Sequence, residues 1–160
     1  RSADRPTWPN LLDNFVSFSF FCPLTYPFLG TLVLFNLDKR QVVFSSDAHT
    51  DSINAVCFLP HSSRIVTCGQ AGFLKVIEPD GTEVFAVNVG EPARCVVTDG
   101  QFLVVGTQGG SLKVYEVVSG AFVVSFKGHS GAVSAIARSH NGKFIVTGGE
   151  DQTIRVWTMP

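Results

Sequence analysis

The chain has 160 residues, which is enough for one domain with its own core, and its charge is nearly balanced, with 12 Lys and Arg against 13 Asp and Glu. That balance leaves no basic patch for electrostatic capture of nucleic acid, and a content of 45% apolar and 16% charged residues excludes a disordered chain. The 15 Gly and 14 Phe residues favour strands and tight turns over helices.

Residues 1–30 are the least regular part of the sequence, and we interpret them as a degenerate strand or a leader. Residues 14–37 lack charged side chains, so a membrane span is an alternative interpretation. Two prolines and a glycine interrupt that stretch, however, and FVSFSF (15–20) alternates as a strand does. We therefore expect no membrane segment.

From residue 31 onward the sequence repeats with a period of about 40 residues. One strand-like segment recurs as TLVLF (31–35), FLKVI (73–77), SLKVY (111–115) and TIRVW (153–157). A second recurs as RIVTCG (64–69), FLVVGT (102–107) and FIVTGG (144–149). Pairs such as Asp99-Gly100 and Asn141-Gly142 separate the segments, as antiparallel hairpins require. Each unit is expected to form four short strands, with the units at 31–46 (partial), 49–88, 90–127 and 128–158.

The last unit carries the clearest motif, Gly128-His129 followed by NGKFIVTGGEDQTIRVW (141–157). This segment resembles a WD repeat, which is one blade of a β-propeller. The resemblance implies a buried hydrogen-bonded tetrad, here His129, Thr147, Asp151 and Trp157. It also implies an all-β fold, namely a partial β-propeller of about three to three and a half four-stranded antiparallel blades in an incomplete ring.

The other units depart from this pattern. In the unit at 49–88, His49 and Thr67 match the tetrad, but Ala71 replaces the Asp and Ile77 replaces the Trp. In the unit at 90–127 the His position is not identifiable, and the Thr, Asp and Trp positions hold Val105, Gly109 and Tyr115. We interpret both as degenerate blades in which apolar packing replaces the polar set.

A catalytic reading of the same loop is a remote alternative. Gly128-His129-Ser130-Gly131 lies close to the Gly-x-Ser-x-Gly nucleophile elbow, which would make the chain a serine hydrolase fragment with Ser130 as its nucleophile. Ala132 stands where the elbow needs its second glycine, and that motif also requires a helix after the serine. The sequence therefore predicts no enzyme.

Metal and cofactor chemistry has little support in the sequence. The four Cys share no C-x-x-C spacing, and the four His do not cluster with them, so we expect no metal site and no cofactor. Isolated cysteines are typical of free thiols in a reducing compartment. We therefore expect an intracellular, cytoplasmic protein.

The resemblance to WD-repeat propellers implies a binding function, because members of that family present loop-lined faces that dock other proteins. The expected function is a non-catalytic protein–protein interaction scaffold, with other proteins as partners and no nucleic acid. Candidate contact residues are Gln70, Arg94, Gln108, Lys127 and Glu150. The alternative is a structural propeller portion of a larger multidomain trafficking, signalling or enzyme-complex protein, since fold does not specify partner.

The number of predicted blades is small for a closed ring, since propellers usually have four to eight. We therefore expect either the C-terminal part of a longer propeller or a subunit that completes a ring by association. In both cases open blade edges should favour self-association.

Overall fold

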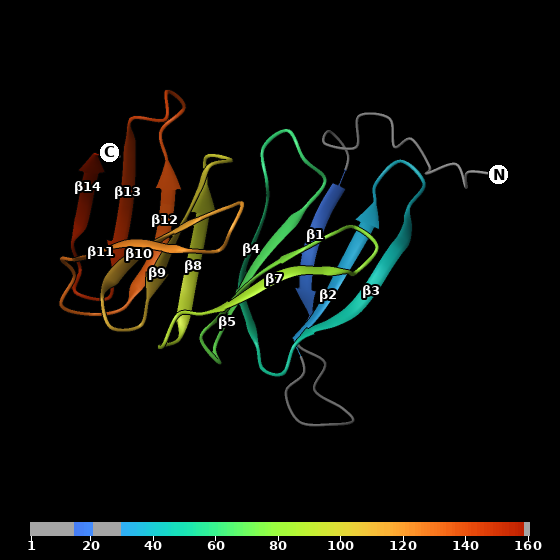
Figure 1. Ribbon diagram of the computed structural model, residues 1–160, viewed down its shortest axis with the longest axis horizontal. Helices are drawn as coiled ribbons and strands as arrows, with labels where there is room; N and C mark the ends of the chain where they lie inside the picture. The colour runs from blue at the N-terminus through green and yellow to red at the C-terminus, as the bar shows by residue number, and fades with distance from the viewer. Residues whose placement is uncertain (1–14, 21–29, 159–160) are drawn as a thin grey trace.

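The computed structural model describes residues 15–20 and 30–158 of the chain, and every regular element in these ranges is a β-strand. The strands form four antiparallel sheets that follow one another in chain order (Figure 1). This arrangement confirms the predicted all-β, partial β-propeller fold.

Each sheet is built from strands that are consecutive in the sequence. The first sheet contains β1 (Phe15–Phe20), β2 (Gly30–Asn36) and β3 (Gln41–His49). The second contains β4 (Ile53–Phe58), β5 (Ile65–Gly69), β6 (Phe73–Ile77) and β7 (Glu83–Asn88). The third contains β8 (Ala93–Thr98), β9 (Phe102–Thr107), β10 (Ser111–Glu116) and β11 (Phe122–Lys127). The fourth contains β12 (Val133–Arg138), β13 (Phe144–Gly149) and β14 (Ile154–Thr158).

The sheets stand side by side like blades, with their first strands adjacent. Strand β8 contacts both β4 and β12, so these three strands form the inner row, while β7 and β11 are the outermost strands of their sheets. Because each sheet is antiparallel, β4, β8 and β12 begin at the same end at which β5, β9 and β13 finish. We call this the turn end of the structure.

Apolar side chains fill the space between neighbouring sheets. The alternation of side chains along a strand gives each sheet two faces, and a sheet between two others needs both faces apolar. Strand β5 is such a strand, and all five of its residues are buried. The interface of the first and second sheets includes Leu32, Leu34, Ile65 and Ile77. That of the second and third includes Val66, Leu74, Leu103 and Tyr115.

The predicted hairpins form where the turn residues placed them. Gly100 and Gly142 have φ angles of +95° and +72°, a region in which side chains with a Cβ are strained. Both lie in turns between the first and second strands of their sheets. The Asp-Gly and Asn-Gly pairs therefore predicted the positions of these individual turns.

The first sheet begins earlier than the predicted unit at 31–46. The segment FVSFSF is β1, which pairs along its length with β2, so that Phe18 lies opposite Val33. Residues 1–14 and 21–29 lie outside the described residues, so the interpretation of residues 1–30 as a degenerate strand or a leader stays a prediction. Among the residues described, no helix is long and apolar enough to cross a membrane.

Candidate functional site

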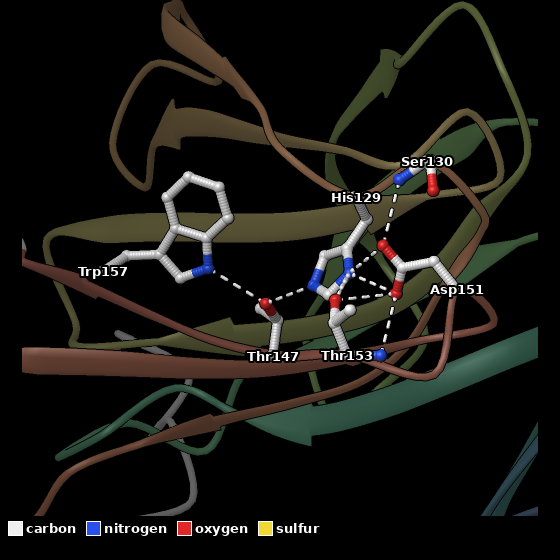
Figure 2. Close-up of polar contacts among 6 residues, drawn as sticks. All are labelled: His129, Ser130, Thr147, Asp151, Thr153 and Trp157. Atoms are coloured by element: carbon white, nitrogen blue, oxygen red, sulfur yellow. Dashed lines mark hydrogen bonds and ion pairs between the residues drawn. The ribbon is translucent and has the colours of Figure 1, made fainter.

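The clearest polar site lies at the turn end of the fourth sheet, around His129. Its imidazole is buried, and Nδ1 lies 2.9 Å from Oδ1 and 3.0 Å from Oδ2 of Asp151 (Figure 2). Nε2 lies 2.8 Å from the hydroxyl of Thr147, and the indole Nε1 of Trp157 donates to that hydroxyl at 2.9 Å. The structure therefore brings together all four residues of the tetrad.

The chemistry of these groups sets the direction of the hydrogen bonds. An ionised carboxylate only accepts, so His129 donates from Nδ1 to Asp151. In a neutral ring Nε2 is then the acceptor, and Thr147 donates its hydroxyl hydrogen to it while accepting from Trp157. Each buried group is satisfied, so the set is a closed network of structural hydrogen bonds.

Asp151 joins two loops of the fourth sheet. Besides His129 it accepts from the backbone N–H of Ser130 at 3.0 Å, and from the N–H and hydroxyl of Thr153 at 3.1 and 2.8 Å (Figure 2). The hydrogen bond from His129 holds the pKa of this carboxyl well below its usual range, and Ser130 and Thr153 add to the effect. The carboxylate thus ties the β11–β12 loop to the β13–β14 turn.

The second sheet holds half of this network. Nε2 of His49 lies 2.8 Å from the hydroxyl of Thr67, and both residues are buried. Ala71 and Ile77 occupy the Asp and Trp positions, and Ile77 packs in the apolar interface with the first sheet. Burial lowers the pKa of His49 to about 4, with a smaller contribution from the positive charge of Lys75, so the ring is neutral at physiological pH.

The third sheet replaces the network by apolar packing, and the structure identifies its missing position. The N–H of Val89 donates to the carbonyl of Gly72 at 2.8 Å, and the N–H of His129 donates to that of Gly110 at 3.2 Å. Gly72 and Gly110 lie in equivalent turns of consecutive sheets, so Val89 occupies the His position. It packs in one apolar cluster with Val105 and Tyr115.

Sequence reasoning missed Val89 because it searched for a histidine. The signal that could have found it is spacing, since Val89 precedes β8 as His129 precedes β12. The neighbouring strand carries a matching change. A Cβ at Gly149 would clash with Nδ1 of His129, whereas the equivalent position opposite Val89 holds Thr107.

The loop around Ser130 does not meet the requirements of a nucleophile elbow. The predicted elbow needs a helix after Ser130, but Val133–Arg138 is strand β12. Both ring nitrogens of His129 are engaged by Asp151 and Thr147, and the backbone N–H of Ser130 donates to Asp151. His129 therefore has no free nitrogen with which to act as a base for Ser130.

Three of the candidate contact residues occupy one repeated position. The N–H groups of Gln70, Gln108 and Glu150 donate to the carbonyls of Ser52, Pro92 and Ala132 at 2.9, 2.9 and 2.8 Å. These are equivalent contacts in three consecutive sheets, and they place the three side chains at the turn end. Gln108 and Glu150 are exposed, and Gln70 is half-buried.

The other two candidates lie at the same end. Arg94, at the beginning of β8, forms an ion pair with Glu150 of the neighbouring sheet, with Nη2 and Oε1 3.3 Å apart. Lys127 is exposed at the end of β11. Asn54 makes a further contact between sheets, because its side-chain amide donates to the carbonyl of Ala93 at 2.7 Å. The turn end is therefore a polar surface that spans three sheets.

Neither a metal cluster nor a reactive thiol is found in the part of the chain that the structure describes. No group of three or more His, Cys, Asp or Glu side chains in this part could hold a metal ion. Cys57, Cys68 and Cys95 are free, and burial raises the pKa of their thiols to about 11, about 12 and about 11. They are protonated at neutral pH and behave as small apolar side chains.

Comparison with known proteins identifies similarity to WD-repeat proteins. The family model described as "WD domain, G-beta repeat" matches residues 40–78 and 120–158. The chain is 28% identical over 134 residues to telomerase protein component 1 of Mus musculus, which covers 81% of this chain and 5% of that protein. It is 40% identical over 72 residues to pre-mRNA-processing factor 19 homolog 2 of Arabidopsis thaliana, covering 45% of this chain and 14% of that protein.

A solved structure has the same fold. The crystal structure of the computationally designed Ika4 protein superposes with a TM-score of 0.77 at 21% identity, over 92% of this chain and 86% of that one. The chain thus spans a small part of the natural relatives and most of the designed protein.

Proposed function

The chain belongs to the WD-repeat family, and from this premise we propose that it is a non-catalytic scaffold whose turn end binds other proteins. WD-repeat proteins in general serve as interaction scaffolds, and the turn end is the part of this chain suited to that role. Binding residues are found most often on loops that a rigid framework positions.

The observation that carries this proposal is the repeated position at the turn end, which is half-buried in the second sheet and exposed in the third and fourth. Gln70, Gln108 and Glu150 make the same backbone contact in three sheets, so their side chains are presented in a regular row. In the fourth sheet the His129–Asp151 contact holds the adjoining loops in place. A partner would meet a surface that is ordered before it binds, which lowers the entropic cost of association.

The chemistry of the turn end fits a protein partner. Arg94 and Glu150 supply opposite charges, and the two Gln side chains supply both donors and acceptors. Mixed polar groups of this kind typically form the rim of protein–protein interfaces, and arginine is enriched there. The row has no excess of basic residues of the kind that nucleic acid binding requires.

The test is affinity capture with matched variants. The triple variant R94A/Q108A/E150A removes both members of the ion pair together, so neither charge is left unpaired. The control variant K39A/K143A changes exposed residues in turns at the opposite end. We expect the triple variant to capture at least tenfold less of the partner proteins than the wild type and the control do. Equal capture by all three proteins would contradict the proposal.

A second candidate function is a structural propeller portion of a larger trafficking, signalling or enzyme-complex protein. It is favoured by the small share of the natural relatives that the chain spans, 5% and 14%. Under this proposal the variant R94A/Q108A/E150A would leave partner binding unchanged. Substitutions that destabilise the propeller fold would instead impair the function of the larger protein.

An intracellular, cytoplasmic location is also our proposal. The free state of Cys57, Cys68 and Cys95 supports it, since a reducing compartment keeps thiols unpaired. Fractionation of cells that express a tagged chain tests it, and recovery from the medium would contradict it.

A further inference from the structure

The turn between β12 and β13 contains the Asn-Gly pair of the sequence, Asn141-Gly142. Asn141 is exposed and Gly142 is half-buried. The side-chain carbon Cγ of an asparagine can be attacked by the backbone nitrogen of the next residue, which closes a succinimide ring. Glycine leaves that nitrogen unshielded, because it has no side chain. Every other asparagine in the sequence precedes a residue with a side chain, so Asn141 is the asparagine most open to this reaction.

Gly142 lies beside a positive charge. Its φ angle is +72°, and a Cβ at this position would collide with Nη2 of Arg138. The guanidinium group therefore lies directly against Gly142, and a larger residue does not fit there. A neighbouring cation favours the deprotonated form of the Gly142 nitrogen, which is the form that attacks.

The surroundings of Asn141 also favour a negative product. Arg138, His140 and Lys143 lie within three residues of it, and in the part of the chain that the structure describes no carboxylate pairs with any of them. A carboxylate at position 141 would reduce this local excess of positive charge.

Hydrogen bonds within the turn oppose the reaction. Oδ1 of Asn141 accepts from the hydroxyl of Ser139 at 2.8 Å and from the backbone N–H of Lys143 at 3.1 Å. The N–H of Gly142 donates to the carbonyl of Ser139 at 2.9 Å. Both reacting groups are therefore engaged, and the turn has to open before Cγ and the nitrogen meet.

The second sheet shows that an aspartate fits such a turn. In the β6–β7 turn Oδ1 of Asp80 accepts from the N–H of Thr82 at 2.9 Å, and the N–H of Gly81 donates to the carbonyl of Glu78 at 2.9 Å. Gly81 has a φ angle of +90°. These contacts repeat those of Asn141-Gly142, so the product of deamidation is a residue type that this fold already accommodates.

We propose that Asn141 is a deamidation site, whose rate is set by the hydrogen bonds of the β12–β13 turn. The deprotonated nitrogen of Gly142 attacks Cγ of Asn141 and forms the N–Cγ bond. The Cγ–Nδ2 bond then breaks, and Nδ2 takes a proton from water and leaves as ammonia. Water adds to one of the two carbonyls of the succinimide and opens the ring, so the net change is hydrolysis of the amide to a carboxylic acid.

The two directions of ring opening have different consequences for the fourth sheet. Opening at Cγ gives aspartate and restores the backbone. Opening at the main-chain carbonyl gives isoaspartate, in which the backbone passes through the side chain and gains a methylene. Arg138 pairs with Ile145 next to this turn, so the longer backbone disturbs the β12–β13 register, whereas aspartate does not. The turn lies at the end opposite the turn end, and the inference goes beyond the proposed scaffold function without resting on it.

The test follows residue 141 in the incubated 160-residue chain. Trypsin cuts after Arg138 and Lys143 and releases SHNGK (139–143), and an unincubated sample gives the starting value. We expect the mass gain of an amide that becomes an acid in this peptide, in two chromatographic forms, aspartate and isoaspartate. Peptides that contain Asn54 or Asn88 should show no comparable gain. The synthetic peptide ARSHNGKFI (137–145), incubated alone, should react at least tenfold faster than the folded chain, because it has no turn to open.

Matched variants locate the control of the rate. Ser139→Ala removes the hydroxyl that holds Oδ1 and should speed deamidation of the folded chain about fivefold, while Ser139→Thr should keep the wild-type rate. The same Ala change in the synthetic peptide should have no effect. Arg138→Gln should slow the reaction of the folded chain about threefold, and Arg138→Lys should restore it. A far-UV circular dichroism spectrum of each variant checks that the β-fold is kept.

The products can be compared directly. The variant Asn141→Asp should unfold at the same urea concentration as the wild type, and the isolated isoaspartate form at a lower one. Equal rates in the folded chain and the peptide, an unchanged rate in S139A, or faster conversion at another asparagine would each overturn the proposal. Failure of the partner-capture test would leave all of these rates unchanged, so the two proposals fail separately.

Discussion

The second and fourth sheets each bury a histidine at the turn end, but they surround it differently. In the fourth sheet Asp151 and Thr147 hold both nitrogens of His129, and Trp157 completes the set. In the second sheet Thr67 binds Nε2 of His49, and the positions of Asp151 and Trp157 hold an alanine and an isoleucine. The third sheet extends the series, because Val89 replaces the histidine altogether.

The series shows that a blade keeps its shape when a buried polar group and its buried partner are kept together or replaced together. A buried polar group is stabilising only while its partners are present, and an orphaned one costs about 1–3 kcal/mol. The third sheet lost the imidazole and the hydroxyl together, with Val105 in place of the threonine. The second sheet kept the imidazole of His49 and the hydroxyl of Thr67, and only the Asp and Trp positions changed, to Ala71 and Ile77.

Replacing His129 by Val should cause the largest loss of stability. The hydroxyl of Thr147 would lose its imidazole partner, Asp151 would lose its strongest contact, and a cavity would remain. We expect the free energy of unfolding to fall by about 3 kcal/mol, measured by urea denaturation. The same change at His49 orphans one hydroxyl, and we expect a loss of about 1 kcal/mol. Equal losses at the two sites would contradict the comparison.

Acid should weaken the second sheet through His49. Its pKa is about 4 in the folded chain, against an ordinary value of 6.5, because of burial, then the charge of Lys75, offset in part by Glu83. Between these values the unfolded state binds a proton that the folded state does not, so stability rises with pH and is lost as the pH falls from about 6.5 to about 4. The free energy of unfolding should fall by about 2 kcal/mol over this pH interval.

Urea denaturation at pH 7 and at pH 4.5 measures this dependence. The variant His49→Val has no group to titrate at that position, so its stability should change less over the same interval. If the stability of the wild type and of H49V depended on pH in the same way, titratable groups other than His49 would be responsible for the acid destabilisation.

Replacing Ala71 by Asp should produce the smallest effect, a gain. The carboxylate would stand where Asp151 stands in the fourth sheet and would accept from Nδ1 of His49. We expect stability at pH 7 to rise by about 1 kcal/mol and the acid loss to shrink, because a negative neighbour raises the pKa of His49.

The isosteric variant Ala71→Asn is the matched control for this gain. It offers an acceptor without a charge, so it should leave the pKa of His49 low, which NMR titration of the ring protons measures. A His49 pKa near 4 in both variants would show that the introduced carboxylate does not reach the ring.

Much of the fold follows from local features of the sequence. The turn pairs Asp99-Gly100 and Asn141-Gly142, the alternation of apolar residues and the period of about 40 predict antiparallel strands in repeated units. The four residues around His129 were also identifiable, because Thr147, Asp151 and Trp157 keep the spacing of the motif. The equivalents in the other sheets were harder to recognise as their residue types changed.

The sequence by itself determined the strands, the turns and the polar tetrad of the fourth sheet, because each depends on residues at short, regular spacing. Only the tertiary structure decided that β1 pairs with β2, that Val89 takes the place of a histidine, and that Nε of Arg155 is buried without a hydrogen-bond partner among the described residues. These features depend on which residues lie opposite or beneath one another across strands and sheets. Such contacts join positions far apart in the chain and leave no local pattern in the sequence.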